Sequence, residues 1–374
     1  MKKTLVAAAL LGTFAASAFA APSVNVYGKI DTGLLYTHTD DKTANAPTDT
    51  VEMKSGWASG SRWGMTGTED LGNAKVGFIL ESGFTSDDGA SAQGGRLFGR
   101  QATVSVSGAY GTVYAGRIGS VNSDIGTIGM LANVSPFGSS FTDLGTHGST
   151  GNNWDRYDNT IAYASPKIAG FYGNAMYSFK SDTQARDAKS DEGTSDATRY
   201  AAAGIGYKNG ALDLVLTGDY TFYGRKAYDT KNKVTKDFDG NDGWSVVLGG
   251  NYNFGVATAY GKATYFNHQV AATDSFSLLK DTEAEQVKGW GVSFGAKVPV
   301  FGGNFLAEVG YRDARDVEDN SNDFKRWNAT VGYNYAFSKR TSAYATGGWT
   351  QEKSNELNRT PNKVLVGAGL IHSF

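Results

Sequence analysis

The sequence contains no cysteine, six prolines and only four histidines among its 374 residues. The absence of cysteine excludes zinc–thiolate sites, iron–sulfur clusters, disulfide frameworks and a cysteine nucleophile. An excess of charge is also lacking, because 35 lysines and arginines nearly balance 37 aspartates and glutamates. Without an overall positive field, the chain has no general attraction for nucleic acid. Glycine (49 residues) and aromatic residues (20 Tyr, 20 Phe and 7 Trp) are, by contrast, abundant.

Apolar runs are short everywhere, and the one at the N-terminus has the pattern of a secretory signal. The basic residues Lys2 and Lys3 precede an apolar run over 5–11, and 18–20 fits a small-x-small cleavage site. A membrane-anchoring helix would need about 20 apolar residues. The sequence therefore predicts a signal peptide over 1–20, cleavage after Ala20, and a single exported domain over 21–374. No later run is apolar enough for a transmembrane helix.

Apolar and polar residues alternate along the rest of the chain. For example, Leu212, Leu214 and Leu216 alternate with Asp213 and Thr217. Successive side chains point to opposite faces of a strand, so each such run predicts a strand with one apolar face. The runs are about 10–13 residues long, against 5–6 in soluble sheets. Their apolar faces often end in aromatics, as a strand that crosses a bilayer in about 9–11 residues requires. A soluble β-sandwich would alternate too, but without that length or those aromatic ends.

The connections alternate between short and long. Short turns are expected near 69–73, 108–109, 165–169, 208–210, 253–255, 299–303 and 337–340. Long polar loops are expected near 37–55, 86–97, 120–155, 182–196, 224–241, 269–286, 315–323 and 353–361. Seven short turns and eight long loops join sixteen strands. The fold class predicted is therefore all-β: a closed 16-stranded antiparallel transmembrane β-barrel, with short periplasmic turns and long extracellular loops. A barrel of this size leaves an aqueous lumen.

Seven sequence stretches, in this order and spacing, carry a family resemblance. They are 26–33 (VYGKIDTG), 61–72 (from SRWG to GTEDLG), 80–84 (LESGF), 97–102 (LFGRQA), 110–117 (from YGTV to GR), 158–166 (from DNT to YASP) and 372–374 (HSF). The chain resembles the general bacterial porins of Gram-negative outer membranes, of the beta-proteobacterial type. The resemblance implies a homotrimer in the outer membrane, surrounded by its lipid. It also implies that loop 120–155 folds inward as a constriction loop, and that Phe374 is an assembly signal for the barrel-assembly machinery.

In these porins a ladder of basic wall residues faces acids on the third loop. The resemblance carries this ladder onto Lys29, Arg62, Arg100 and Arg156. Alternation predicts that three of them face the lumen, because their neighbours of opposite parity are apolar and face outward. These outward neighbours are Val26, Ile30 and Leu34 for Lys29, Trp63 and Met65 for Arg62, and Tyr157, Ile161 and Tyr163 for Arg156. Asp158 and Thr160 are expected to face the lumen beside Arg156.

Arg100 does not fit the simple alternation, since it shares its face with Val104 and Val106. A lumen position for Arg100 requires a β-bulge or a buried subunit interface. Arg117 is expected to be structural, near the subunit contact. The small outward residues Gly28, Thr32 and Gly67 suggest that the early strands form the trimer surface.

The third loop departs from the family pattern. The usual motif is Pro-Glu-Phe-Gly, whereas this chain has Ser135, Pro136, Phe137 and Gly138, with proline at the acidic position. The loop acids that remain nearest are Asp124 and Asp143. Losing a carboxylate opposite several basic groups predicts a weak preference for anions. Other lumen charges expected from alternation are Asp31, Glu81, Asp213, Asp219, Lys262, Lys297, Glu308 and Arg312.

The function predicted is passive diffusion of small hydrophilic solutes and ions through a water-filled channel. A substrate-specific channel for a small anionic solute or a sugar is the alternative, and a non-conducting adhesin or anchor barrel is a third class. An enzyme is not expected. His147 lies near Asp143 and Ser149, but the glycine-rich surroundings offer no rigid shell to hold a triad. No cofactor, metal or nucleic acid partner is expected.

Overall fold

The computed structural model describes residues 23–43, 46–144, 155–184, 190–229, 234–270, 278 and 286–374. The predicted signal peptide lies outside this part of the chain, as do 145–154 of the predicted constriction loop, including His147 and Ser149. No helix among the described residues has the length and apolar character needed to cross a membrane.

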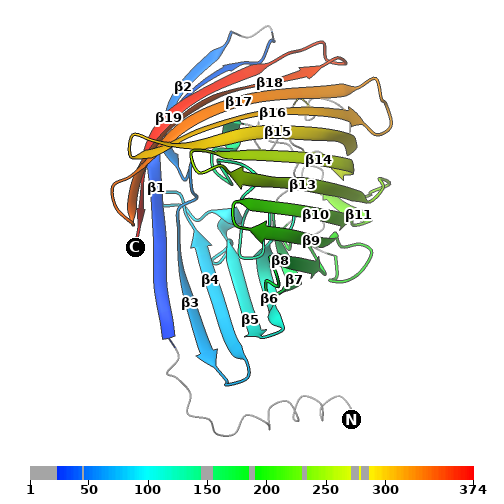
Figure 1. Ribbon diagram of the computed structural model, residues 1–374. Helices are drawn as coiled ribbons and strands as arrows, with labels where there is room; N and C mark the ends of the chain where they lie inside the picture. The colour runs from blue at the N-terminus through cyan, green and yellow to red at the C-terminus, as the bar shows by residue number, and fades with distance from the viewer. Residues whose placement is uncertain are drawn as a thin grey trace.

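Nearly all the described secondary structure is β-strand (Figure 1). The strands are β1 (Ser23–Asp40), β2 (Thr48–Ser55), β3 (Arg62–Asp70), β4 (Lys75–Gly83), β5 (Gln101–Gly108), β6 (Gly111–Gly119), β7 (Arg156–Ala164), β8 (Phe171–Ser178), β9 (Arg199–Asn209), β10 (Leu212–Phe222), β11 (Lys226–Asp229), β12 (Val234–Asp237), β13 (Gly243–Asn253), β14 (Thr258–Val270), β15 (Gln286–Val300), β16 (Gly303–Asp316), β17 (Asp323–Ala336), β18 (Thr341–Ser354) and β19 (Asn362–Ser373). Two short 3-10 helices, η1 (Gln93–Gly95) and η2 (Thr142–Leu144), lie in connections.

The strands form one closed antiparallel barrel, as predicted. Each strand pairs with its neighbour along the chain, and β19 pairs with β1 to close the wall. The sheet has 17 strands, but β2 and β3 pair with successive halves of β1 and together make one interrupted strand. The wall is therefore 16-stranded, and β11 and β12 form a separate hairpin. Closure leaves no unpaired sheet edge in the membrane.

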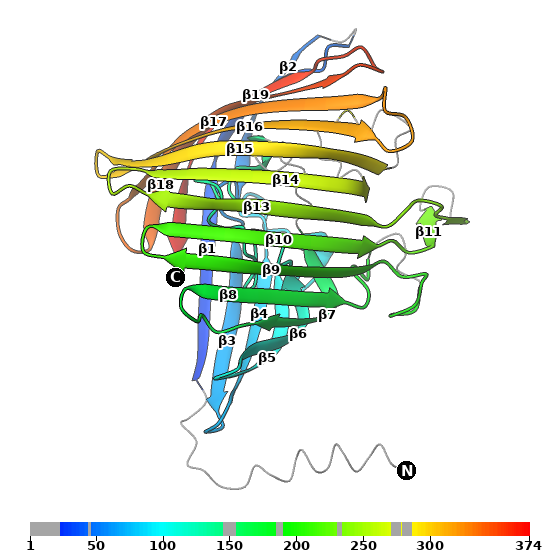
Figure 2. The ribbon, with the colours of Figure 1, turned by 45° about the vertical axis from the view of Figure 1, so that its right-hand side comes forward.

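Short turns and long connections lie at opposite ends of the barrel. In Figure 2 the short β9–β10 and β15–β16 turns and the C-terminus lie at the left, while the long connections extend to the right. The C-terminus is therefore on the short-turn side, as an even number of strands requires. The structure differs from the prediction in two connections: strands β1 and β2 occupy most of 37–55, and the hairpin β11–β12 lies within 224–241.

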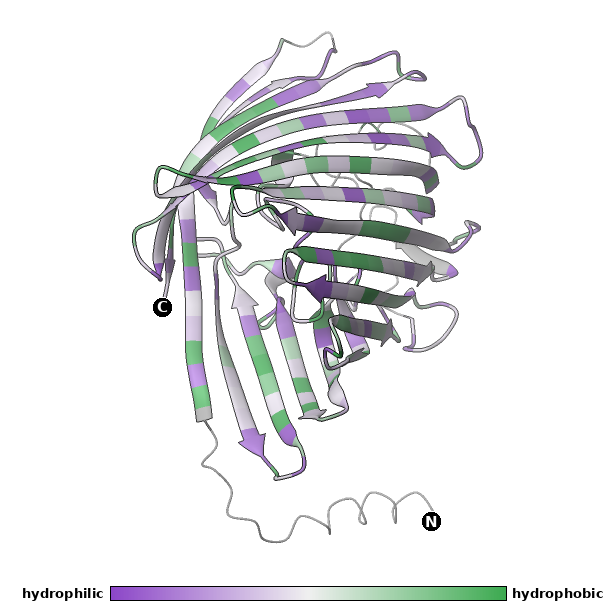
Figure 3. Cartoon of the chain, in the orientation of Figure 1, coloured by the Kyte–Doolittle hydropathy of each residue, from purple (hydrophilic) through white to green (hydrophobic). Residues whose placement is uncertain are grey.

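Side-chain alternation produces a polar lumen and an apolar outer face. Figure 3 shows the resulting bands of hydrophobic and hydrophilic residues along the strands. On β1 the outward Val26 and Leu34 are 66% and 60% exposed, whereas the intervening Asp31 is 0% exposed. The prediction fails at Tyr157, which is buried on the inner side, because Asn159 has a positive φ of 48° and the β6–β7 register shifts there. This irregularity reverses the alternation at the start of β7.

Candidate functional site: the pore constriction

The connection after β6 folds into the barrel and follows its inner wall. The side chain of Ser120 bonds to the Tyr200 hydroxyl at 2.7 Å, and Asn122 Nδ2 donates to Ser245 Oγ at 3.0 Å. Further along, Asn133 Nδ2 donates to Asp213 Oδ2 at 3.1 Å. The loop thus passes across β9, β13 and β10 in turn, which confirms that it folds inward. In Figure 1 this coil lies inside the barrel, behind the β13–β18 wall.

The next part of the loop packs into an apolar cluster at the opposite side of the barrel. Phe137, Phe141 and Leu144 are buried there against Trp57 and Tyr344, among others. The rings of Trp57 and Phe141 are 4.9 Å apart and nearly perpendicular, and Phe141 N–H donates to Trp57 O at 2.8 Å. This end of the loop is therefore fixed to the interruption between β2 and β3.

Glycines in the wall allow the loop to approach closely. A Cβ at Gly295 would lie 2.6 Å from Pro136 Cδ, and one at Gly249 would lie 2.7 Å from Val134 Cγ1. Both distances are far below van der Waals contact, so only glycine leaves room for the loop. Pro136 thus packs on the wall at the place where the related motif carries its acid.

Three residues of the predicted basic ladder, Lys29, Arg62 and Arg100, lie together beside Glu81, and Arg156 lies within electrostatic range of it. Arg100 Nε contacts Glu81 Oε1 at 2.7 Å, and an Arg62 nitrogen lies 3.9 Å from the same oxygen. Lys29 and Arg156 both interact electrostatically with Arg100 and Glu81. Glu81 therefore contacts two arginines and accepts a hydrogen bond from the Tyr27 hydroxyl at 2.9 Å, whereas Lys29 also interacts with Asp31, and Arg156 with Asp155.

Arg100 reaches this cluster through a β-bulge. Its N–H donates to Glu81 O at 3.1 Å, yet the next residue, Gln101, is the one that pairs with Glu81 in the β4–β5 register. Two residues thus oppose one, which is the pattern of a bulge and re-aims the side chain. This is the first of the two arrangements that the sequence left open for Arg100.

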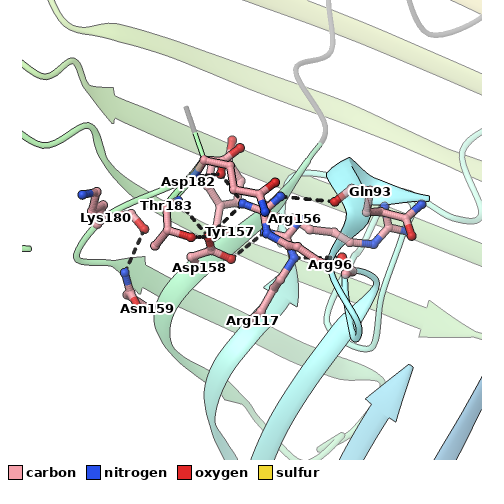
Figure 4. A network of polar contacts seen from close by, with 12 residues as sticks. Gln93, Arg96, Arg117, Arg156, Tyr157, Asp158, Asn159, Lys180, Asp182 and Thr183 are labelled. Carbon is pink, nitrogen blue, oxygen red and sulfur yellow. Dashed lines mark hydrogen bonds and ion pairs between the residues drawn. The ribbon is translucent and has the colours of Figure 1, made fainter. Parts of the chain in front are cut away.

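Asp158 joins a second polar network, to which Arg156 contributes its backbone carbonyl as the acceptor of a 3.2 Å hydrogen bond from Arg117 (Figure 4). Arg117 and Arg96 contact its carboxylate at 2.6 and 3.3 Å, and the Thr183 hydroxyl donates to it at 2.8 Å. Arg96 also pairs with Asp182. Arg117 and Asp158 are only 11% exposed at their side chains. The network therefore joins the connections before β5 and after β8 to the wall, which is a structural role.

Of the two predicted loop acids, one lies apart from the ladder and the other has a side chain outside the described part of the structure. Asp124 interacts electrostatically with Lys262 of β14 and Glu308 of β16. Asp143 lies in η2, and its side chain is outside the described part of the structure. The Ser135 hydroxyl donates a hydrogen bond to Glu308 of the wall. The loop motif, which has no acid of its own, therefore contacts a carboxylate of the wall.

Most other predicted lumen charges bind the wall or the loop. The Asp213 carboxylate accepts hydrogen bonds from Lys208 and Asn133. The Asp219 carboxylate accepts hydrogen bonds from Tyr200 and Ser245. Arg312 pairs with Glu352 at 2.8 Å, and Arg326 pairs with the same carboxylate at 2.6 Å. Lys297 is half-buried opposite Thr258 near the short-turn end. The sequence interpretation missed Arg326 and Glu352, although they share their strands' lumen parity with Asn328 and Thr350.

Asp31 is a structural residue rather than a charge exposed to the pore. Its carboxylate accepts the N–H groups of Ala58 and Ser59 at 2.9 and 2.7 Å and the Tyr344 hydroxyl at 2.9 Å. It thereby holds the segment between β2 and β3 against the inner wall. That segment presents the Ser59 hydroxyl, which accepts a hydrogen bond from Arg62 at 2.7 Å.

A cavity of about 500 Å³ lies between the loop and the wall next to the ladder. Its lining is mixed and includes Lys29, Ser59, Ser139, Asn304 and Tyr344. No three His, Asp or Glu side chains in the described part of the chain are grouped closely enough to hold a metal ion. The arrangement offers hydrogen-bonding and charged groups to a solute in passage.

Comparisons with known proteins agree with this architecture. Residues 6–355 match the Gram-negative porin family. The chain is 35% identical to an outer membrane porin protein of Bordetella pertussis, over 100% of both chains. It is 30% identical to outer membrane porin protein 32 of Delftia acidovorans, over 99% of this chain and 95% of the other. Among solved structures, the anion-selective porin from Comamonas acidovorans matches with a TM-score of 0.69 and 26% identity, over 94% of this chain and 100% of the other. With its closed barrel and inward third loop, the chain belongs to the Gram-negative porin family and is an outer-membrane β-barrel channel.

Proposed function

We propose that this porin admits small hydrophilic solutes by passive diffusion, with a weak preference for anions. One observation carries the preference: the four bases Lys29, Arg62, Arg100 and Arg156 outnumber the three acids with which they interact, Glu81, Asp31 and Asp155. The loop motif that meets the wall has Pro136 where the related motif has an acid. A surplus of positive charge beside a water-filled path favours anions over cations. The similarity to an anion-selective porin also supports a preference for anions.

Reversal potentials in a salt gradient test this proposal. Arg62→Ala or Arg156→Ala should each shift the anion-to-cation permeability ratio toward cations by roughly two- to threefold. One unit charge about 7 Å away in water is worth roughly 0.6 kcal/mol, which gives this factor. Lys339→Ala, on an exposed short turn, is the matched control and should leave the ratio unchanged. Cation selectivity in the unmodified protein would overturn the proposal.

A channel specific for one anionic solute or sugar is not favoured. Liposome swelling separates this alternative from general diffusion. With solutes of graded size, uptake through a general channel falls smoothly as size increases. Saturation by one solute, with little uptake of others of equal size, would instead establish specificity. Loss of all single-channel steps in folded protein would indicate a non-conducting barrel.

We infer from the family resemblance that the protein assembles as a homotrimer. Gly28 and Gly67, two of the small outward residues, do not by themselves support the early strands as the surface of contact between subunits. A Cβ at Gly28 would lie 2.2 Å from Phe374 Cζ, and one at Gly67 would lie 2.4 Å from Phe78 Cε1, so rings of the same chain cover both glycines. Chemical cross-linking and mass measurement of folded protein in mild detergent test the trimer, and a monomer would contradict it.

Two processing steps complete the proposal. Residues 1–20 direct export and are removed after Ala20, which N-terminal sequencing of the purified protein tests. Phe374 is the residue that the barrel-assembly machinery recognises. Phe374→Ala should therefore lower the amount of folded protein in the outer membrane of cells more than it lowers refolding of purified protein. Equal losses in the two assays would assign Phe374 a purely structural role.

A further inference from the structure

The outer wall of β15–β17 carries a row of aromatic rings near its long-loop end. The ring centroids of Trp290 and Tyr311 are 5.4 Å apart, and those of Tyr311 and Trp327 are also 5.4 Å apart. Trp290 is 44% exposed on the outward face. Tryptophan and tyrosine collect at membrane–water interfaces, so this row marks the extracellular boundary of the hydrocarbon region.

Four basic residues lie just beyond this row, toward the long connections. Lys288 and Lys325 precede Trp290 and Trp327 by two positions and therefore share their outward face. Arg315 pairs with Lys288 in the β15–β16 register, and Lys353 pairs with Lys325 in the β17–β18 register. We call Lys288, Arg315, Lys325 and Lys353 the outer basic patch. It lies at the height of the lipid headgroups.

The patch contains two like-charged cross-strand pairs, Lys288 with Arg315 and Lys325 with Lys353. Like charges directly opposite each other destabilise an antiparallel pair. Two acids offset them in part: Asp313 lies 3.4 Å from Arg315, and Asp323 lies 3.2 Å from Lys325. Among the described residues, Lys288 and Lys353 have no ion-pair partner. Four bases against two acids leave a surplus of two positive charges on the outer wall.

Further acids lie above the outer basic patch rather than within it. Glu318 and Asp319 lie further out, at the tip of the β16–β17 connection. The Asp319 carboxylate accepts hydrogen bonds from the N–H and the hydroxyl of Ser321, at 2.9 and 2.6 Å, and so stabilises the turn in which it lies. These hydrogen bonds lower the pKa of Asp319.

At this height, the charged residues of two other sectors of the wall have different partners. On β9 and β10, Arg199 lies 5.1 Å from the Phe222 ring, and Tyr220 donates to Asp242 at 3.4 Å. On β1 and β2, the Asp49 carboxylate accepts the Tyr36 hydroxyl and contacts His38. Neither the β9–β10 nor the β1–β2 pairing sets two basic residues opposite each other in the described structure. These two sectors therefore lack the like-charged pairs of the outer basic patch.

We propose that the outer basic patch binds the phosphate groups of a phosphorylated glycolipid in the outer leaflet. The aromatic row contacts the boundary between headgroup and acyl chains, and the basic side chains reach the phosphates above it. An anion seated between the like-charged pairs removes their repulsion. Lysine and arginine at a membrane surface each add substantially to the binding of anionic lipids. The site lies outside the pore, so it is independent of ion selectivity.

Titration of folded protein in zwitterionic detergent with lipid A, a diphosphorylated glycolipid, tests the proposal. The double variant Lys288→Gln with Lys353→Gln should bind lipid A at least about tenfold more weakly, because each basic residue contributes roughly a factor of five. EDTA in the buffer prevents divalent cations from bridging lipid phosphates to Glu318 and Asp319. The matched control, Lys75→Gln with Lys339→Gln, removes two exposed lysines at the short-turn end. It should bind lipid A as the unmodified protein does.

Dephosphorylated lipid A and phosphatidylglycerol distinguish the ligand. We expect both to bind more weakly than lipid A and equally to the unmodified protein and the double variant. Equal affinity of the double variant and unmodified protein for lipid A overturns the proposal, as does phosphatidylglycerol binding as tightly as lipid A. A second readout does not depend on affinity. Without lipid, Lys353→Gln should raise the thermal unfolding midpoint by relieving repulsion from Lys325, and with lipid A the order should reverse. The same order in both conditions contradicts the proposal.

Discussion

Glu81 is the carboxylate that contacts two arginines of the ladder. Its carboxylate contacts Arg100 and Arg62 and accepts the Tyr27 hydroxyl, and its side chain is only 17% exposed. One acid thus offsets part of the charge of four bases and also fixes the direction in which Arg100 points. We therefore expect selectivity to depend on this residue as much as on any single arginine.

Glu81→Gln should increase the anion-to-cation permeability ratio by about two- to threefold, because it removes one negative charge a few ångströms from the solute path. Glutamine has nearly the same shape and keeps one side-chain oxygen, which can accept the hydrogen bond of Arg100, while its NH2 group replaces the oxygen that faces Tyr27. Reversal potentials in a salt gradient measure the effect. Glu69→Gln, on an exposed position beside the β3–β4 turn, is the control. An unchanged ratio in Glu81→Gln would argue against the ladder as the selectivity element.

Glu352 has a different role, because it joins two buried arginines. Its carboxylate pairs with Arg312 and Arg326, and all three side chains are at most 8% exposed. Removing one partner of such a network costs about 3–5 kcal/mol, since it leaves buried charge less compensated. Glu352→Gln should therefore lower the thermal unfolding midpoint of folded protein in detergent. Glu318→Gln, in the exposed β16–β17 connection, should leave the midpoint unchanged. A similar midpoint for both variants would show that the network contributes little.

At the scale of elements, the interruption between β2 and β3 links the wall to the constriction loop. Asp31 of β1 holds this segment through the N–H groups of Ala58 and Ser59. The segment in turn accepts loop hydrogen bonds: Phe141 N–H donates to Trp57 O at 2.8 Å, and the Ser140 hydroxyl donates to Ala58 O at 2.5 Å. The position of the loop tip therefore depends on one buried carboxylate in the wall.

Asp31→Asn should destabilise the folded protein by roughly 1.5–3 kcal/mol, because hydrogen bonds to a charged group are lost. The loop end should also move more, which we expect to appear as increased open-channel noise and a broader distribution of single-channel conductance. Asp40→Asn, near the long-loop end of the same strand, serves as the control. Unaltered noise together with a lowered thermal midpoint would separate the stability of the wall from the position of the loop.

Side-chain alternation predicted most of this wall correctly, and it failed where the backbone is irregular. The lumen position of Lys29 and the outward positions of Val26 and Leu34 follow from regular strand geometry alone. Tyr157 was assigned to the wrong face, because a bulge depends on local hydrogen bonding that a period of two cannot describe. The role of Asp31 was missed for a related reason: its partners, Ala58 and Ser59, lie in a segment without alternation.

At the scale of the whole molecule, the barrel closes where the last residue meets the first strand. Gly28 and Phe374 exchange backbone hydrogen bonds of 3.1 and 3.0 Å, and the Phe374 ring covers Gly28. An aromatic ring over a glycine in a neighbouring strand stabilises the register of a sheet. The register at closure therefore depends on the absence of a side chain at Gly28.

Gly28→Val should reduce the fraction of protein that refolds, because its Cβ would lie 2.2 Å from Phe374 Cζ. The fraction that migrates as the folded form on unheated gels measures this yield. In a Phe374→Ala background the ring is gone, so Gly28→Val should have a much smaller effect, as expected for two residues in direct contact. Additive losses in the double variant would show that the two residues act independently.

The path of the third loop has a mechanical consequence. Its two described ends lie at β6 and β7, yet its middle is attached to β10 through Asn133, to β16 through Ser135 and to the β2–β3 segment through Phe141. A hollow cylinder resists outward pressure evenly but flattens easily under sideways load. A strap fixed across its interior at several points carries tension and holds the cross-section in one shape. We therefore expect the third loop also to brace the barrel when osmotic swelling stretches the surrounding membrane.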